Sequence, residues 1–137
     1  MAKLTVIIPA GNELHNIEGV IKSVSFADEI IVVDSFSSDG TYEIAKQLAT
    51  KVIRRKYEYS ASQKNWAIPQ ANYEWILLVD ADERVTSELE NEIKLLMQNP
   101  PNDIAAYSIG RNNHFMGEKV NFSGWKNDSV IRLFKRD

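Results

Sequence analysis

Four short runs of apolar and β-branched residues alternate along this chain with stretches of helical periodicity. The runs are residues 4–8, 29–33, 51–54 and 74–79. Continuous apolar runs are typical of strands buried on both faces of a parallel sheet. Because strands that alternate with helices form right-handed βαβ units, the sequence predicts an α/β fold with a mostly parallel sheet flanked by helices. We expect the first strand to stop at Pro9.

The stretches between the runs predict the helices. Residues 13–25 carry apolar side chains three and four positions apart, as on one face of an amphipathic helix. A second helix is expected after the polar cluster 35–40, and residues 60–71 suit a less regular helix. Ser87 and Glu90 have the spacing of a capping box, which predicts that a helix begins there.

The pattern changes after residue 101. Short apolar pieces separated by turns rich in Asn and Gly predict antiparallel or mixed sheet in the C-terminal portion. These pieces are residues 104–110, 119–122 and 130–134. A chain of 137 residues is long enough for one α/β domain and short for two, so we expect a single domain over residues 1–137.

Composition narrows the classes of partner. The formal charge of −3, from 16 basic and 19 acidic side chains, provides no broad cationic surface and argues against nucleic acid as a partner. Without cysteine there is neither a disulfide framework nor a thiolate metal site, and the cytoplasm is the expected compartment. The apolar runs are far shorter than the roughly 20 residues that span a bilayer, so no membrane segment is expected.

Asp80 and Asp82 follow the last of the four apolar runs. In an extended backbone, side chains two positions apart point the same way, so both carboxylates could face one point. Two carboxylates suit Mg²⁺ or Mn²⁺, which would take its other ligands from a diphosphate and water. The alternative is a solvated acidic turn that caps the next helix.

Three further side chains are candidates at the same edge of the predicted sheet. Asp34 follows the second strand, where a carboxylate could accept a hydrogen bond from a nucleobase or a ribose hydroxyl, or could equally cap a turn. Asp39 is predicted to cap the following helix, with ligand contact as a second possibility. Lys64 could pair with a phosphate, and the alternative is a solvated lysine.

Four ordered motifs together resemble the family 2 glycosyltransferases, which are inverting enzymes of the GT-A fold. The motifs are Val6-Ile7-Ile8-Pro9-Ala10-Gly11-Asn12-Glu13, Val32-Val33-Asp34-Ser35 with Ser38-Asp39-Gly40-Thr41, Gln63-Lys64-Asn65, and Leu78-Val79-Asp80-Ala81-Asp82-Glu83. The tail is similar to the branch related to lipopolysaccharide-core β-1,4-glucosyltransferases, at Gly117, Gly124-Trp125 and Ile131-Arg132-Leu133-Phe134.

The resemblance implies a role for each matching position. The residues that would line the nucleoside pocket are Pro9, Ala10, Gly11, Asn12 and Glu13. Asp34 would hold the uracil or ribose, and Lys64 would lie near the nucleotide. Asp80 would approach the ribose and the metal, Asp82 would be the principal metal ligand, and Ala81 between them would belong to the nucleotide-sugar site.

The reaction implied is transfer of a hexose, such as glucose, from a UDP-sugar to a glycan or lipid-linked acceptor in cell-envelope polysaccharide synthesis. Mg²⁺ or Mn²⁺ would neutralise charge on the diphosphate leaving group, while a base deprotonates the acceptor hydroxyl. The expected compartment remains the cytoplasm, with association to the inner face of the membrane left open.

Two departures from the family pattern shape the expectations. Gly11 stands where most members have an aromatic residue that packs on the nucleobase, which leaves the base preference open. The family's base is expected beyond residue 137, with Asp128 as the candidate inside the chain. We therefore expect residues 1–101 to bind the donor, residues 102–137 to begin the acceptor side, and the chain to bind donor and metal with weak or no transfer.

Two alternatives remain at this point. The chain could be a non-catalytic nucleotide-sugar-binding module that keeps the donor half alone. It could also be a phosphoacceptor receiver domain, in which an acidic cluster binds Mg²⁺. A receiver domain needs paired acids after its first strand, where this chain has only Glu13.

Overall fold

The computed structural model describes residues 2–56, 65–100, 106–109 and 131–136. Within these residues the strands form one sheet in the order β3-β2-β1-β4-β6-β5. The strands are β1 Leu4–Ala10, β2 Glu29–Asp34, β3 Lys51–Arg54, β4 Trp75–Leu78, β5 Ala106–Ile109 and β6 Ile131–Lys135. The helices are α1 Ile17–Ser23, α2 Thr41–Leu48, the 3₁₀ helix η1 Ile68–Gln70 and α4 Ser87–Gln98.

Strand β1 lies between two parallel neighbours. It pairs with β2 on one side and with β4 on the other, and β2 pairs in parallel with β3. Strand β6 runs antiparallel to both β4 and β5. The predicted α/β fold with a mostly parallel sheet and an antiparallel C-terminal portion is confirmed. The predicted piece 119–122 lies outside the described residues.

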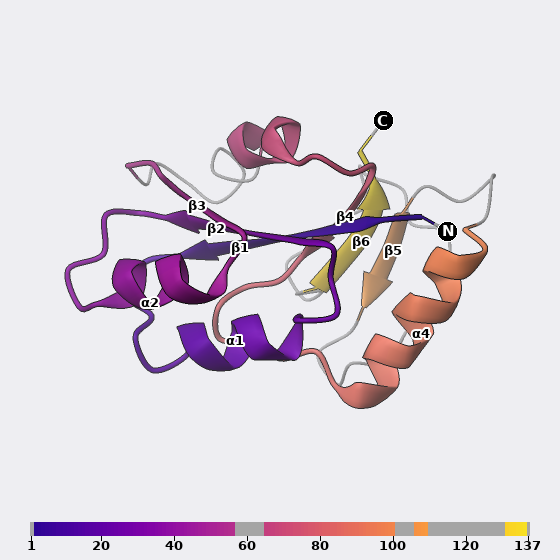
Figure 1. Cartoon of the computed structure of the whole chain (residues 1–137), viewed down its shortest axis with the longest axis horizontal. Helices are drawn as coiled ribbons and strands as arrows, with labels where there is room; N and C mark the ends of the chain where they lie inside the picture. The colour runs from indigo at the N-terminus through magenta and orange to yellow at the C-terminus, as the bar shows by residue number, and fades with distance from the viewer. Residues whose placement is uncertain (1, 57–64, 101–105, 110–130, 137) are drawn as a thin grey trace.

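Both faces of the sheet are covered (Figure 1). Helices α1, α2 and α4 pack on one face, where the alternating strand residues Val6, Val32 and Leu77 belong to one apolar cluster with the helices. The intervening residues, such as Ile7, face a second cluster with Ala67 from the segment before η1. This alternation is the period of two expected for side chains along a strand.

The prediction that the first strand stops at Pro9 is wrong, because β1 continues to Ala10. The carbonyl of Ile7 accepts a hydrogen bond from Val79 N at 3.1 Å, so Ile7 and Pro9 direct their backbone groups toward the β4 side. Strand β4 ends at Leu78, opposite Ile7. The missing N–H of Pro9 therefore falls beyond the paired part of β4, and β1 tolerates the proline.

The predicted start of the first helix also differs from the structure. Residues 13–16 form turns, with Asn16 N and Ile17 N donating to Glu13 O at 2.9 and 2.8 Å, so α1 begins at Ile17. The predicted helix start at Ser87 is confirmed, because α4 begins there, but Ser87 is not the capping residue. Thr86 is the N-cap of α4, and its hydroxyl accepts from Leu89 N at 3.1 Å. The register of the cap is one residue earlier because Thr86, in an extended conformation, already supplies the oxygen.

Glu29 is a buried carboxylate at the amino end of β2, with 2% of its surface exposed. It accepts hydrogen bonds from Thr5 Oγ1 at 2.7 Å, Asn72 N at 2.9 Å and Asn72 Nδ2 at 2.6 Å. It therefore joins β1, β2 and the loop before β4. A buried carboxylate is tolerated because its oxygens are hydrogen-bonded.

We expect Glu29→Leu to destabilise the fold by about 1–3 kcal/mol, because buried donors that faced the carboxylate lose their acceptor. The measurement is urea unfolding followed by circular dichroism. The matched control is Glu92→Leu on the exposed side of α4, expected to change the free energy of unfolding by less than about 0.5 kcal/mol. Equal effects of the two substitutions would contradict a structural role for Glu29.

Among the residues described, no helix combines the length and the apolar character needed to cross a membrane.

Candidate functional site

The candidate residues that the structure describes gather at the carboxyl edge of the parallel strands. Ala10 at the end of β1 lies opposite Asp34 of β2, which lies opposite Arg54 of β3. On the other side of β1, the chain leaves β4 at Val79 and reaches Asp80 and Ala81. Ligands of open parallel sheets bind at this edge, where the loops that follow the strands converge.

Asp34 is fully buried at that edge, with 0% of its surface exposed. Its Oδ1 accepts a hydrogen bond from Ser37 Oγ at 2.6 Å, and its Oδ2 accepts from Ser37 N at 3.0 Å. Arg54 Nε lies 3.2 Å from Oδ2 and forms an ion pair with it. Because the carboxylate is fully buried, a nucleoside could reach it only if the surrounding loop moved.

Arg54 is held between that carboxylate and two aromatic rings. The carbon centre of its guanidinium lies 3.5 Å from the ring centroid of Tyr42 on α2 and 5.4 Å from that of Phe36. These distances are within the range of cation–π contacts. Phe36 is 58% exposed and has a φ of 56°, so the loop after β2 presents an aromatic side chain to solvent beside the site.

Asn12 joins the loop after β1 to the loop after β2. Its backbone N donates to Ser37 Oγ at 2.8 Å, and its Oδ1 accepts from Ser38 N at 2.8 Å. Asn12 has a φ of 52°, a left-handed conformation that asparagine adopts more readily than most residues. Ser37 therefore connects Asn12 to the buried Asp34, and the two loops have one hydrogen-bond network.

A second connection runs through Asp39 and the first residue of α2. Thr41 Oγ1 accepts from Glu13 N at 2.9 Å and donates to Asp39 Oδ1 at 2.5 Å. Asp39 also accepts from Thr41 N at 3.0 Å and from Leu14 N at 3.1 Å. The prediction that Asp39 caps the second helix is wrong by one position, because Gly40 is the N-cap of α2. Asp39 precedes that cap, and its carboxylate joins the first residue of α2 to the loop after β1.

Residues 80–83 form a turn, closed by Glu83 N donating to Asp80 O at 3.0 Å. The expected extended backbone between Asp80 and Asp82 is therefore wrong, because this hydrogen bond closes a turn across both residues. Glu83 Oε1 accepts from Asp80 N at 2.8 Å and supports the turn from its other end. Ala81 is buried at 2% exposure, whereas Asp82 is exposed to solvent.

Within the described residues, no group of three or more His, Cys, Asp and Glu side chains could hold a metal ion. Asp80 and Asp82 alone supply two hard oxygen donors at one turn. Such a set suits Mg²⁺ or Mn²⁺, which bind proteins through one or two carboxylates and take further ligands from substrate phosphates and water. The donor set therefore fits a divalent ion that arrives with a diphosphate.

Two candidate residues, Lys64 and Asp128, lie outside the described residues. So do Gln63 and the tail positions Gly117 and Gly124-Trp125.

Sequence reasoning missed Ser37 and Arg54 as members of the site, and it gave Arg84 no role. Ser37 lay in a cluster interpreted only as a loop before a helix. Arg54 is the last residue of β3. Because the ends of parallel strands meet at one edge of the sheet, its position in the sequence is a signal that could have identified it. Arg84 follows the acidic turn directly, and nothing local in the sequence identifies its partners.

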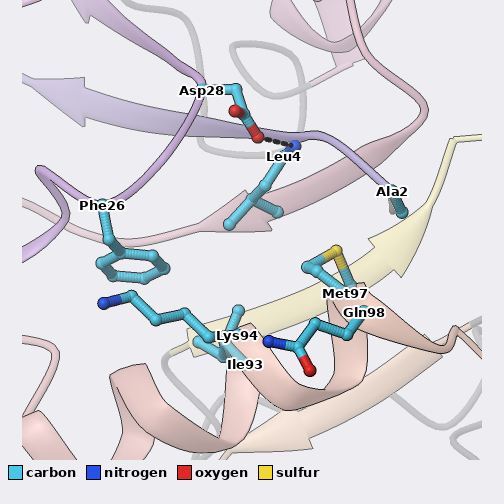
Figure 2. Close-up of a pocket in the computed structure, with 8 residues that line it drawn as sticks. All are labelled: Ala2, Leu4, Phe26, Asp28, Ile93, Lys94, Met97 and Gln98. Atoms are coloured by element: carbon cyan, nitrogen blue, oxygen red, sulfur yellow. Dashed lines mark hydrogen bonds between the residues drawn. The ribbon is translucent and has the colours of Figure 1, made fainter.

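One pocket lies at the opposite edge, near the amino end of β1 (Figure 2). It has a volume of about 260 Å³ and is lined by Ala2, Leu4, Phe26, Asp28, Ile93, Lys94, Met97 and Gln98. Asp28 Oδ2 accepts from Leu4 N at 2.9 Å, and the Lys94 ammonium lies 5.9 Å from the Phe26 ring centroid. None of the predicted site residues that the structure describes lines this pocket.

The chain belongs to the glycosyl transferase family 2, whose model matches residues 5–135. A glycosyltransferase of Rickettsia felis is 40% identical over 111 residues, which are 80% of this chain and 39% of that protein. The lipopolysaccharide core biosynthesis glycosyltransferase LpsC of Rhizobium meliloti is 28% identical over 97% of this chain and 51% of its own length. The chain thus spans about half or less of these relatives.

Solved structures agree on the fold. The mannosyltransferase PcManGT of Pyrobaculum calidifontis, in complex with GDP-Man and Mn²⁺, matches 98% of this chain and 44% of its own with a TM-score of 0.72 and 22% identity. Glucosyl-3-phosphoglycerate synthase of Mycobacterium tuberculosis, in complex with Mn²⁺ and UDP, matches 98% of this chain and 57% of its own with a TM-score of 0.69 and 19% identity. The fold is GT-A, and the family match removes the receiver-domain alternative.

The hydrogen bond from the Thr41 hydroxyl holds the pKa of Asp39 below 3.8, its ordinary value. The ionised carboxylate therefore contributes stability that is present above the ordinary pKa and is lost as pH falls through the lowered pKa. We expect Asp39→Ala to be less stable than the parent at neutral pH, with a smaller difference in acid. The urea unfolding midpoints of the parent and of Asp39→Ala, at neutral and at acidic pH, measure this difference. A difference that does not change with pH would contradict it.

Proposed function

We propose that this chain binds a nucleotide-diphosphate sugar, a UDP-hexose such as UDP-glucose, together with Mg²⁺ or Mn²⁺. It would form the donor side of an inverting glycosyltransferase that acts in the cytoplasm on a glycan or lipid-linked acceptor of the cell envelope. Residues 1–101 are proposed as the donor-binding part, and residues 102–137 as the beginning of the acceptor side. The family match and the similarity to LpsC support this proposal.

One observation carries the proposal. The loop after β1, the loop after β2 and the acidic turn after β4 lie at one edge of the sheet, and hydrogen bonds connect them. Asn12 contacts Ser37 and Ser38 of the second loop, and Asn16 contacts Arg84 beside the acidic turn. A nucleotide with its diphosphate spans more than one of these loops, so a site of this kind needs them in a fixed relation.

The nucleoside is proposed to lie over the loop after β1. This loop contributes Pro9, Ala10, Gly11, Asn12 and Glu13. Asp34 remains the proposed partner for uracil or ribose, with its hydrogen bond to Ser37 or its contact with Arg54 exchanged when the nucleoside binds. Lys64 is proposed to lie near the nucleotide. A Cβ on Gly11 would lie 3.6 Å from Ser35 Cβ, which is an ordinary van der Waals contact, so the position has room for a side chain to begin.

Asp82, exposed on the turn, is proposed as the principal metal ligand, and Asp80 as the second. When bound, the divalent ion would neutralise the charge that develops on the diphosphate leaving group. The chain's own contribution is to present two carboxylates on a turn whose backbone is fixed at Asp80 and Glu83. Asp128 remains the candidate base inside the chain, and the family's base is proposed to lie in the part of the relatives that this chain does not match.

We expect UDP to bind more tightly with Mn²⁺ than without it, and Asp82→Ala to lose that gain. The loss is expected to be about tenfold or more in Kd, which is ~1.4 kcal/mol per factor of ten. Isothermal titration calorimetry of UDP, with Mn²⁺ and with EDTA, measures the affinity for UDP with and without the metal. Titration with GDP tests base preference, which is predicted to favour UDP.

The matched control is Glu92→Ala, which removes an exposed carboxylate from α4 and is expected to leave both affinities unchanged. Binding of UDP that is insensitive to Mn²⁺, or equal binding by the parent and Asp82→Ala, would overturn the metal site. Steady hydrolysis or transfer of UDP-glucose by the 137-residue chain would overturn the expectation that the base lies outside it.

A further inference from the structure

Arg84 directly follows the acidic turn, and its side chain folds back onto that turn. Its Nη1 donates hydrogen bonds to Ala81 O at 2.9 Å and to Glu83 O at 2.7 Å. Hydrogen bonds from a charged guanidinium are stronger than those between neutral groups. Because the Ala81 carbonyl belongs to the peptide that leads into Asp82, Arg84 restrains the orientation of the backbone that carries the exposed carboxylate.

The other side of the same guanidinium contacts α1. Arg84 Nη2 donates to Asn16 Oδ1 at 3.1 Å, and Asn16 Nδ2 donates to Glu13 Oε1 at 3.1 Å. Glu13 belongs to the loop after β1, whose backbone is in turn held by Thr41. A chain of side-chain hydrogen bonds therefore runs from the acidic turn to the proposed nucleoside loop, across 68 positions of sequence between Arg84 and Asn16.

Gly19 provides the space in which the guanidinium lies. A Cβ on Gly19 would stand 2.7 Å from both Nε and Nη2 of Arg84, closer than such atoms approach in proteins. Gly19 is inside α1, where glycine weakens a helix relative to alanine. A glycine at this position is therefore explained by packing, because the Arg84 side chain lies against the helix where a Cβ would be.

We propose that Arg84, seated on Gly19, is a positioning residue for the metal site. Its three hydrogen bonds hold the acidic turn in the conformation that presents Asp80 and Asp82 to the divalent ion, and they fix that turn relative to the nucleoside loop. The inference rests on the proposed function, because it concerns how strongly the ion of that site is held. Arg84 itself touches neither the ion nor the reacting atoms in this role.

The expected effect has a sign that electrostatics alone would not give. Removing a positive charge near a cation site favours the cation, so loss of Arg84 would strengthen Mn²⁺ binding if charge were its only contribution. Loss of a group that orients metal ligands typically weakens metal binding by about 10–100-fold. We therefore expect Arg84→Ala to weaken Mn²⁺ binding by roughly that factor, and to leave UDP affinity in EDTA unchanged.

The experiment is a Mn²⁺ titration in the presence of saturating UDP, followed by electron paramagnetic resonance of the free and bound ion. It compares the parent with Arg84→Ala, Arg84→Lys, Asp82→Ala and Lys22→Ala. Lys22→Ala is the matched control, because it removes a positive charge from the exposed side of α1, and it is expected to leave Mn²⁺ affinity unchanged. Arg84→Lys keeps the charge without the planar fork and is expected to recover only part of the affinity.

A double-mutant cycle with Gly19 keeps the proposal testable if Arg84→Ala lowers stability. In the parent, Gly19→Ala is expected to displace the guanidinium and weaken Mn²⁺ binding. In the Arg84→Ala background the same substitution is expected to cost no further Mn²⁺ affinity and to raise the thermal midpoint, because alanine favours the helix once the space is free. Additive losses of Mn²⁺ affinity in the cycle would overturn the proposal.

The outcomes separate the inference from the proposed function. If the parent does not bind Mn²⁺ with UDP, or if Asp82→Ala binds it equally well, the metal site itself is wrong. If Asp82→Ala loses the ion while Arg84→Ala binds it as tightly as the parent, the metal site stands and the role of Arg84 is overturned.

Discussion

The parallel pairing of β1 with both β2 and β4 is the constraint on which the rest of the structure depends. Because parallel strands end at the same edge, this pairing places the chain after β1, after β2 and after β4 side by side. Strand β1 is buried on both faces, so a one-residue shift of its register would move Ile8 out of the cluster under the helices and into the cluster on the opposite face. The relation between the loops is thus set by the packing of the core, and the polar residues refine it.

The polar residues at that edge mostly hold one another. Asp34 is buried against Ser37 and Arg54, and Asp39 joins the start of α2 to the loop after β1. Asp82, in contrast, lies exposed on a turn whose backbone is held by hydrogen bonds. The site therefore combines an exposed carboxylate with a rigid surrounding, an arrangement that suits an ion bound together with a phosphate ligand.

The mostly parallel sheet could be predicted from the sequence, because apolar runs and helical periodicity are local signals. The contacts within the site could not. Whether Asp80–Ala81–Asp82 is extended or turned depends on a hydrogen bond from Glu83, and Thr86 and Ser87 are neighbouring caps of similar chemistry. The contact between the Arg84 guanidinium and Gly19 joins positions far apart in the sequence, so no local sequence pattern predicts it.

The central claim is that one nucleotide and one divalent ion bind at the carboxyl edge of β2, β1 and β4. Paramagnetic broadening of backbone amide signals by bound Mn²⁺ in the presence of UDP, with Mg²⁺ as the diamagnetic reference, tests this directly. The account predicts that broadening is strongest at residues 80–84, extends to residues 10–13 and 35–38, and spares Leu4 and Met97 at the opposite edge. Broadening centred on the pocket near Leu4 and Met97, with none at residues 80–84, would contradict it.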